Sequence, residues 1–319
     1  MEEFSISQYQ KAPYLELNDY KAPNGIESYF VNMDDGIRIR VCHWLQKKEK
    51  NAGTIFLQQG HNEFIEKYYE TIQEFIDRGY SVICFDWRGQ GMSERMITDI
   101  NKSFITDFKR HDRDLEKILE EIINPFFPKP LIGMGHSMGG CLMLSAFHNH
   151  QTKFDFGVLS APMLGFKNEK FLRTASSIMN FFKKDTDYLI GSKPNMGIET
   201  PFEENDLTTD QERYKRTQML VRMMPSIRLW GVTNSFAKAV NKRFKSVREK
   251  NWAEQINLKI LIINSLNDRV VYSKKISEMS KRLKKSITIE FDNCEHEILM
   301  EKDEHRERFW QEFDNFVKG

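Results

Sequence analysis

The chain has 319 residues, of which 47 are Lys or Arg, 46 are Asp or Glu and 40% are hydrophobic. This length suffices for one large domain or two modest ones, and the balanced charge provides no general attraction to nucleic acid. The sequence contains no run of about 18 apolar residues, so we expect no transmembrane helix. The acidic start, Met1–Ser5, lacks the apolar segment of a secretory signal. The four cysteines do not have the spacing of metal ligands, so we expect reduced thiols in a cytoplasmic protein.

Strand and helix patterns alternate along the first half of the chain. The predicted strands are residues 27–33, 37–45, 54–57 and 80–85, and the predicted helices are residues 63–78 and 104–123. The first two strands form a hairpin around Asp34-Asp35-Gly36. Ser103 is the expected N-cap of the second helix, and Gly79 is a suitable stop for the first.

A short apolar run from Leu131 predicts a buried strand that ends in Gly135-His136-Ser137-Met138-Gly139 and leads into a helix. Strand, Gly-x-Ser-x-Gly turn and helix is the arrangement that exposes a nucleophilic serine at the end of a strand. Glycine is expected on both sides because a Cβ there would collide with neighbouring backbone. The backbone N–H of Met138 would then point from the helix N-terminus towards a developing oxyanion.

The later part of the chain resumes the same alternation after an interruption. Strands are expected over residues 156–159, 259–263 and 287–291, and a closing helix over residues 303–317. The alternation predicts an α/β fold with a mostly parallel, doubly wound sheet, whose ligands bind at the carboxyl ends of the strands. Residues 163–250 show helical stretches without a clear strand. We therefore expect a core of residues 1–162 and 251–319 with a helical cap inserted at 163–250.

A nucleophilic serine needs a base, and the base needs an orienting carboxylate. In hydrolases with this turn, the chain order is Ser, then Asp or Glu, then His, each after a strand. Asp268 follows the strand at 259–263, and His296 follows the strand at 287–291. The sequence thus predicts a catalytic set of Ser137, Asp268 and His296, with Asp292 as the reserve acid.

At these residues the sequence resembles the α/β-hydrolase superfamily, and within it the group of bacterial lysophospholipases, monoacylglycerol lipases and serine aminopeptidase-like hydrolases. Its insertion resembles the cap of the bacterial lysophospholipases. The resemblance covers the chain from about Ile26. It rests on His136-Ser137-Met138-Gly139-Gly140, Asp86-Trp87-Arg88-Gly89-Gln90-Gly91, Ser265-Leu266-Asn267-Asp268-Arg269, Cys294-Glu295-His296-Glu297, Asn205-Asp206-Leu207-Thr208 and Gly231-Val232-Thr233.

The resemblance implies an α/β-hydrolase fold and an acyl-transfer mechanism without a cofactor or a metal. Many relatives carry His-Gly in the oxyanion loop, whereas this chain has Gln59-Gly60-His61. Because backbone N–H groups act there, we assign the oxyanion hole to His61 and Met138 and a substrate contact to Gly60.

The predicted cap is apolar and rich in methionine, which suits a pocket for a flexible acyl chain. Phe171, Phe182, Met219 and Met223 are the expected lining residues. The expected substrate is a small-molecule acyl ester or lysolipid. The basic segment Lys238–Trp252 could give peripheral contact with the inner face of a membrane, although such runs are more often solvated helix faces.

Three functions from different classes stay open. The first is a lysophospholipase or monoacylglycerol lipase, with a general carboxylesterase as a variant. The second is an aminopeptidase of the proline iminopeptidase type, whose substrate ammonium could meet Glu203, Glu204 or Asp206. The third is a non-catalytic ligand-binding protein, which the intact catalytic set disfavours.

Overall fold

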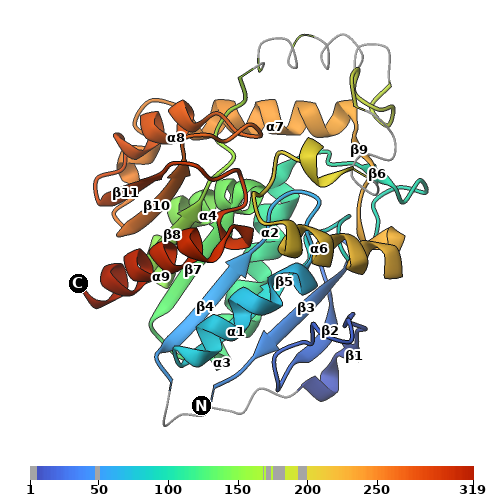
Figure 1. Ribbon diagram of the computed structural model, residues 1–319, viewed down its shortest axis with the longest axis horizontal. Helices are drawn as coiled ribbons and strands as arrows, with labels where there is room; N and C mark the ends of the chain where they lie inside the picture. Colours follow the sequence, from blue (N-terminus) through green and yellow to red (C-terminus); the bar gives the residue numbers. More distant parts are fainter. Residues whose placement is uncertain (1–5, 47–50, 168, 170–173, 175–183, 193–199) are drawn as a thin grey trace.

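The computed structural model describes residues 6–46, 51–167, 169, 174, 184–192 and 200–319. A nine-stranded sheet in the order β1-β2-β3-β5-β4-β7-β8-β10-β11 runs through the molecule (Figure 1). Its strands are β1 (Gln10–Lys11), β2 (Glu27–Asn32), β3 (Arg38–Trp44), β4 (Gly53–Gln58), β5 (Tyr80–Phe85), β7 (Leu131–His136), β8 (Phe156–Ser160), β10 (Ile260–Ser265) and β11 (Ser286–Phe291).

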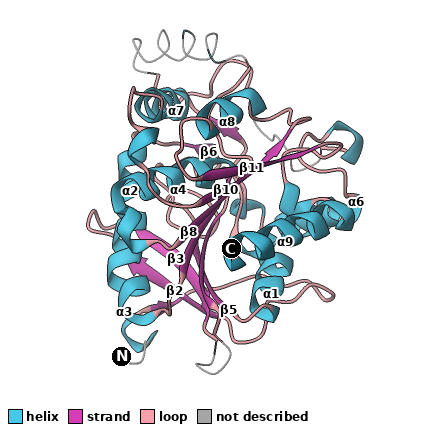
Figure 2. Cartoon of the chain, turned by 90° about the vertical axis from the view of Figure 1, so that its left-hand side faces the viewer, coloured by secondary structure: helices cyan, strands magenta, loops and turns pink. Residues whose placement is uncertain are grey.

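The predicted mostly parallel sheet is confirmed. From β5 across to β11 every neighbouring pair is parallel, whereas β1, β2 and β3 are joined to the sheet antiparallel. The helices are α1 (Tyr69–Asp77), α2 (Phe108–Ile118), α3 (Asn124–Phe126), α4 (Ser137–His150), α6 (Gln211–Met223), α7 (Asn234–Val247), α8 (Ser273–Ser280) and α9 (Asp303–Lys318). Figure 2 shows the sheet between α2 and α3 on one side and α1 and α9 on the other.

Two hydrophobic cores lie on the two faces of this sheet because side chains alternate along each strand. In β10, Ile262 belongs to the core that contains Leu142 of α4, whereas Leu261 and Ile263 belong to the core that contains Phe309 of α9. Every residue of β10 is buried. Burial on both faces explains why the central strands read as continuous apolar runs.

The structure differs from the predicted elements at three places in the first half of the chain. The first predicted helix begins with a 3₁₀ turn at Ile65–Tyr68 before α1. Asp107, and not Ser103, caps α2, since its side chain accepts a hydrogen bond from the backbone N–H of Lys109. A π-helical turn at Leu119–Ile123 follows α2.

The segment between β8 and β10 contains α6, α7 and the short strand β9 (Gly231–Val232). The helical pattern of this segment did not predict β9, which pairs in parallel with β6 (Lys102–Ser103). Phe244 of α7 packs into one core and Leu220 of α6 into the other. The insertion is thus anchored on both faces of the sheet; its delimitation as a cap of residues 163–250 stays a prediction.

Candidate active site

Ser137 stands at the sharp turn between β7 and α4, and its backbone has a φ of 49°. This left-handed conformation is costly for a residue with a side chain. A Cβ at Gly139 would lie 2.4 Å from the carbonyl oxygen of Gln59, and one at Gly135 would lie 2.6 Å from that of Gly139. Only glycine at both positions lets the strand, the helix and the loop after β4 pack this closely.

His296 and Asp268 lie on neighbouring loops after β11 and β10 and are hydrogen bonded. The distance from His296 Nδ1 to Asp268 Oδ2 is 2.6 Å. The other carboxylate oxygen of Asp268 accepts the backbone N–H groups of Val270 at 2.7 Å and Val271 at 2.8 Å. Both side chains are buried, whereas the reserve acid Asp292 is exposed. The pair therefore fixes the ring orientation and leaves Nε2 for another partner.

Burial and charge act in opposite directions on this pair. Burial alone would lower the pKa of His296, but the charge and hydrogen bond of Asp268, with the charges of Glu297 and Glu63, hold it above its ordinary value. Burial alone would raise the pKa of Asp268, and His296 together with the two backbone donors holds it below its ordinary value. Asp268 is thus a carboxylate over the range in which His296 titrates.

Ser137 and His296 line one large cavity. Within the described part of the chain no hydrogen bond joins the two side chains, as is common in unliganded sites, where such contacts tighten only when substrate binds. Ser137 is 7% exposed, so little of it is open to solvent. Ser137, Asp268 and His296, which the motifs place after three different strands, thus lie in one region of the structure.

The loop from Gly60 to Glu63 passes beside Ser137 and is held from several directions. The Gly60 N–H donates to the Glu63 carboxylate, and His61 Nε2 lies 2.6 Å from Ser103 Oγ. Asn62 has a φ of 61°, and its side chain accepts the N–H of Leu229 at 2.6 Å and donates to the carbonyl of Leu229 at 2.9 Å. Gly60 and His61 line the cavity, while Met138 is fully buried. These contacts fix the loop backbone.

A buried ion cluster that the motifs did not predict lies behind this loop. Lys67 Nζ is 2.6 Å from Glu63 and 2.5 Å from Glu297, the residue after His296. Tyr68 donates to Glu63 at 2.8 Å. Burial alone would raise the pKa of Glu63, but the charge of Lys67 keeps this pKa below its ordinary value. Lys67 thus connects the predicted oxyanion loop with the loop that carries His296.

The same region offers possible metal ligands, since atoms of Glu63, His136 and Glu297 lie within 4.8 Å of one another. The ammonium group of Lys67 already binds both carboxylates. Burial also lowers the pKa of His136 to about 3, so its ring is neutral. The cluster is therefore explained as an internal ion network.

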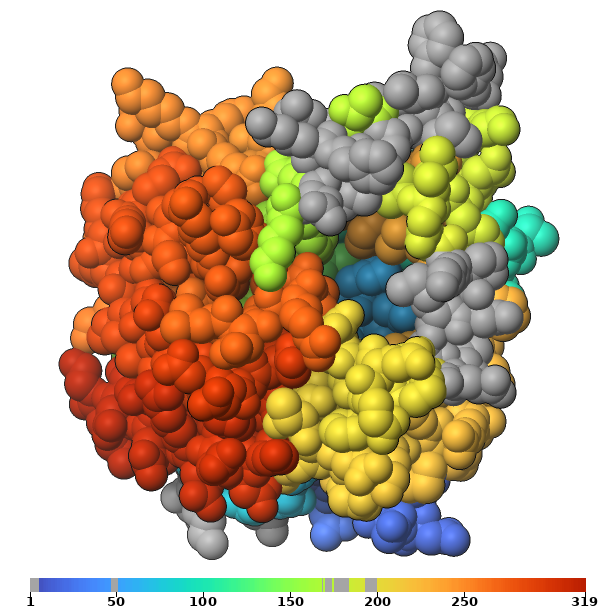
Figure 3. All heavy atoms as spheres, turned by 45° about the horizontal axis from the view of Figure 1, so that its top comes forward, coloured from blue at the N-terminus to red at the C-terminus, as the bar shows by residue number. Residues whose placement is uncertain are grey.

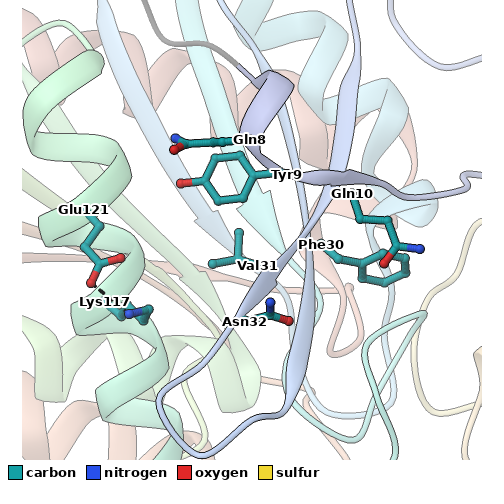
Figure 4. A pocket seen from close by; sticks show the side chains of 8 residues that line it. All are labelled: Gln8, Tyr9, Gln10, Phe30, Val31, Asn32, Lys117 and Glu121. Carbon is teal, nitrogen blue, oxygen red and sulfur yellow. Dashed lines mark hydrogen bonds and ion pairs between the residues drawn. The ribbon is translucent and has the colours of Figure 1, made fainter.

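The cavity has a volume of about 860 Å³ and is lined both by loops at the strand ends and by the insertion. Figure 3 shows a hollow bordered by yellow and orange atoms, with blue atoms of the first quarter of the chain at its floor. Its apolar lining residues include Met163, Phe166, Leu189, Leu207, Phe236, Ala237, Val240, Val270, Val271 and Met300. A second cavity, of about 230 Å³, lies at β1, β2 and α2 and contains none of the predicted site residues (Figure 4).

The predicted acyl-site residues need correction. On α6, Tyr214, Thr217 and Gln218 line the cavity, whereas Met219 and Met223 are 39% and 55% exposed and lie on another face of the helix. Their assignment as lining residues is wrong, because periodicity shows that a helix has an apolar face but not which element covers it. Phe171 and Phe182 lie outside the described residues.

The basic segment is divided between the core and the surface, since Lys238, Lys242, Lys245 and Lys250 are exposed. Arg243 is buried and paired with Asp112 at 2.6 Å, and Phe244 is buried in the core. Lys242 is paired with Asp107 at 2.5 Å. Arg243 and Phe244 are therefore not available to a membrane surface, and membrane contact by the exposed lysines stays a prediction. Among the described helices, none has the length and apolar character needed to cross a bilayer.

Known proteins share this architecture. A family model described as "Serine aminopeptidase, S33" matches residues 49–303. The probable lysophospholipase L2 of Haemophilus influenzae is 25% identical over 283 residues, which cover 88% of each chain. Lysophospholipase L2 of Escherichia coli K12 is 26% identical over 209 residues, covering 65% of this chain and 61% of that protein.

A soluble variant of monoglyceride lipase from Saccharomyces cerevisiae has the same fold, with a TM-score of 0.74 at 18% identity, covering 95% of this chain and 99% of that chain. The α/β-hydrolase fold implied by the motifs is thereby confirmed. Since the family model spans most of the sequence and the fold agrees with it, the chain belongs to the serine aminopeptidase S33 family of α/β-hydrolases.

Proposed function

We propose that this protein is a serine hydrolase that cleaves the carboxylic ester of a monoacyl lipid, either a lysophospholipid or a monoacylglycerol. Relatives named lysophospholipase and monoglyceride lipase support carboxylic ester hydrolysis. The observation that carries the proposal is that His296, hydrogen bonded to Asp268, lines the same cavity as Ser137.

In the proposed reaction, His296 Nε2 takes the proton of the Ser137 hydroxyl while Oγ attacks the ester carbonyl carbon. The carbonyl oxygen becomes an oxyanion held by the backbone N–H groups of His61 and Met138. Loss of one such donor typically lowers the rate by about 10²–10³-fold. His296 then gives its proton to the leaving alcohol oxygen as the C–O bond breaks. Water, deprotonated by His296, hydrolyses the acyl-enzyme and restores Ser137.

The lining supports a substrate with one acyl chain. Phe236, Ala237 and Val240 present one face of α7 to the cavity, and Met163 and Phe166 line it from the chain after β8. Burial of an acyl chain contributes about 0.8 kcal/mol per CH₂. An apolar wall beside polar catalytic loops matches a lipid that has a tail and a polar head.

A lipid surface is the natural source of such a substrate, and exposed apolar side chains support peripheral contact with it. Ile190 lines the cavity and is largely exposed, and Met219 and Met223 are exposed on α6. Cosedimentation of the protein with lysolipid-containing vesicles tests this part of the proposal. Vesicle binding that is unchanged in Ile190→Asp would refute a role for Ile190 in membrane contact.

Aminopeptidase activity is the second candidate, because Glu204 and Asp206 line the cavity. Asp206 already pairs with Arg269 at 3.0 Å, and this pair would have to open to receive a substrate ammonium. The ester reaction requires no such rearrangement.

The decisive experiment compares lysophospholipids, monoacylglycerols and aminoacyl anilides as substrates of the wild type and of Ser137→Ala. We expect ester turnover that Ser137→Ala abolishes, with a melting temperature close to that of the wild type. Turnover of anilides in preference to esters would favour the aminopeptidase. Ester turnover that survives in the folded variant would refute Ser137 as the nucleophile.

A further inference from the structure

The backbone N–H of His61 differs from those of its neighbours in the predicted oxyanion loop. The Gly60 N–H donates to the Glu63 carboxylate, and the Asn62 N–H donates to the side-chain oxygen of Gln90 at 2.6 Å. Among the described residues, no group accepts a hydrogen bond from the His61 N–H. This N–H is therefore free to donate to an oxyanion, and its position depends on what holds residue 61.

The imidazole of His61 is held on two sides by distant parts of the chain. Its Nε2 and the hydroxyl of Ser103 on β6 share a hydrogen bond of 2.6 Å. Its ring lies against the ring of Phe236 on α7, with the ring centroids 4.5 Å apart and the planes inclined by 48°. Burial lowers the pKa of His61 to about 4, so the ring is neutral near pH 7 and adds no charge to the site. The hydrogen bond and the aromatic contact together fix the orientation of the ring.

Ser103 and Phe236 are themselves joined through Thr233, the N-cap of α7. The Thr233 hydroxyl donates to the carbonyl oxygen of Ser103 at 2.8 Å and accepts the backbone N–H of Phe236 at 3.3 Å. Ser103 and Thr233 are both buried. His61, Ser103, Thr233 and Phe236 therefore form a closed cycle of contacts. This cycle connects the predicted oxyanion loop with the helix that forms the apolar wall of the cavity.

We infer that His61 is a positioning residue, whose side chain, held by Ser103 and Phe236, fixes the backbone N–H of the same residue where the ester oxyanion forms. This inference rests on the proposed ester hydrolysis at Ser137. The oxyanion develops only in the transition state, so the side chain of His61 acts on the rate rather than on binding of the ester. A displacement of about 1 Å in such a group can lower a rate about 100-fold.

The first test compares His61→Ala with the wild type, with p-nitrophenyl butyrate as substrate. The variant keeps the backbone N–H and loses only the side chain that orients it. We expect kcat to fall about 10- to 100-fold. Acylation and deacylation both pass through an oxyanion and slow down together, so KM should change by less than about twofold. An unchanged kcat, or a loss confined to KM, would overturn the positioning role.

His148→Ala is the matched control. The imidazole of His148 on α4 also stacks on an aromatic ring, since its centroid is 4.4 Å from that of Trp252, but it does not line the catalytic cavity. We expect the kcat and KM of this variant to match those of the wild type. If kcat fell as far as in His61→Ala, the loss would reflect removal of any stacked imidazole, and the positioning role would be overturned.

Ser103→Ala removes one hydroxyl and serves if His61→Ala does not fold. We expect its kcat to fall by about 5- to 10-fold for one lost hydrogen bond. The double variant of Ser103 and His61 should be no slower than His61→Ala, because both side chains act through one contact. An unchanged kcat in folded Ser103→Ala, or two losses that multiply in the double variant, would overturn the link between the two residues.

A trifluoromethyl ketone with a butyl chain tests the oxyanion directly. Ser137 Oγ bonds to the ketone carbon, the hydroxyl proton passes to His296, and the ketone oxygen becomes the oxyanion of a tetrahedral adduct. We expect the Ki of this ketone to rise in His61→Ala by the factor by which kcat/KM falls. A Ki equal to that of the wild type would contradict the positioning of the oxyanion donor.

The same measurements separate this role from the proposed function. If the wild type hydrolyses no ester, the proposed function fails. If the wild type hydrolyses esters and folded His61→Ala has the same kcat and Ki, only the positioning role of His61 fails.

Discussion

At the residue scale, orientation of His296 depends on one carboxylate. Asp268 uses one oxygen for the imidazole and the other for two backbone N–H groups, so neither the acid nor the ring can turn freely. An amide at this position would offer an N–H to the ring nitrogen and favour the wrong tautomer.

Asp268→Asn should therefore lower kcat for ester hydrolysis by about three to four orders of magnitude, with little change in the melting temperature. Asp292→Asn is the matched control, because Asp292 is an exposed acid on the loop of the base, and it should leave kcat within about twofold. The opposite ranking of the two variants would show that the acid has been misassigned.

Glu297 acts through its charge on His296, the proposed base. Its charge helps to hold the pKa of His296 above the ordinary value. The neutral ring is the active base, so kcat/KM should rise with pH through this pKa. Removal of a neighbouring negative charge lowers the pKa of an imidazole.

Glu297→Gln should therefore move the acid limb of the kcat/KM profile to lower pH. Glu295→Gln is the control, since the Glu295 carboxylate pairs with Arg269, and its profile should match that of the wild type. A shift of the Glu297→Gln limb to higher pH would contradict the electrostatic role.

At the element scale, α7 forms the apolar wall of the cavity. Phe236, Ala237, Val240 and Asn241 line it, whereas Lys238 is exposed. The four residues that line the cavity are spaced as neighbours on one helical face. Chain-length preference should therefore depend on α7 rather than on the methionines of α6.

Ala237→Trp should fill the acyl site and lower the ratio of palmitoyl to butyryl ester turnover by about tenfold or more, because each buried CH₂ is worth about 0.8 kcal/mol. Lys238→Trp, which adds the same ring on the exposed side, should leave the ratio unchanged. If both variants changed the ratio equally, α7 would not contact the acyl chain.

At the scale of the whole molecule, ion pairs join the insertion to the core. Glu70 of α1 binds Arg213 at 2.5 Å and also binds Arg216, both on α6. Burial alone would raise the pKa of Glu70, but Arg213, Arg306 and Arg216 lower it to about 2. A carboxyl group with a depressed pKa stabilises the folded state above its unfolded pKa and loses that contribution as the pH falls through its folded pKa.

Glu70→Gln should therefore lower the free energy of unfolding at pH 7 by on the order of 1 kcal/mol, after allowance for solvent screening. The difference from the wild type should shrink as the pH falls from 4.5 to about 2. Urea denaturation at several pH values measures it, with Glu307→Gln as an exposed control on α9. A difference that is constant over this range would exclude an electrostatic contribution.

Much of the fold could be predicted from the sequence, and so could the positions of Ser137, Asp268 and His296 after strands, because these features depend on local rules. Continuous apolar runs identify strands buried on both faces, and the parallel order brings their carboxyl ends to one edge. Gly135 and Gly139 mark the turn at Ser137 because only glycine fits there. Asp268 and His296 could be located because each follows a strand.

The tertiary structure alone decided which distant groups meet. Lys67 pairs with Glu297 across 230 positions of the chain, and Asn62 holds Leu229 across 167; no local pattern links these residues. Helical periodicity indicated apolar faces on the insertion, but docking turned Met219 and Met223 of α6 to solvent and Ala237 and Val240 of α7 to the cavity. Which face is buried depends on the surface that the helix meets, and that surface exists only after the chain has folded.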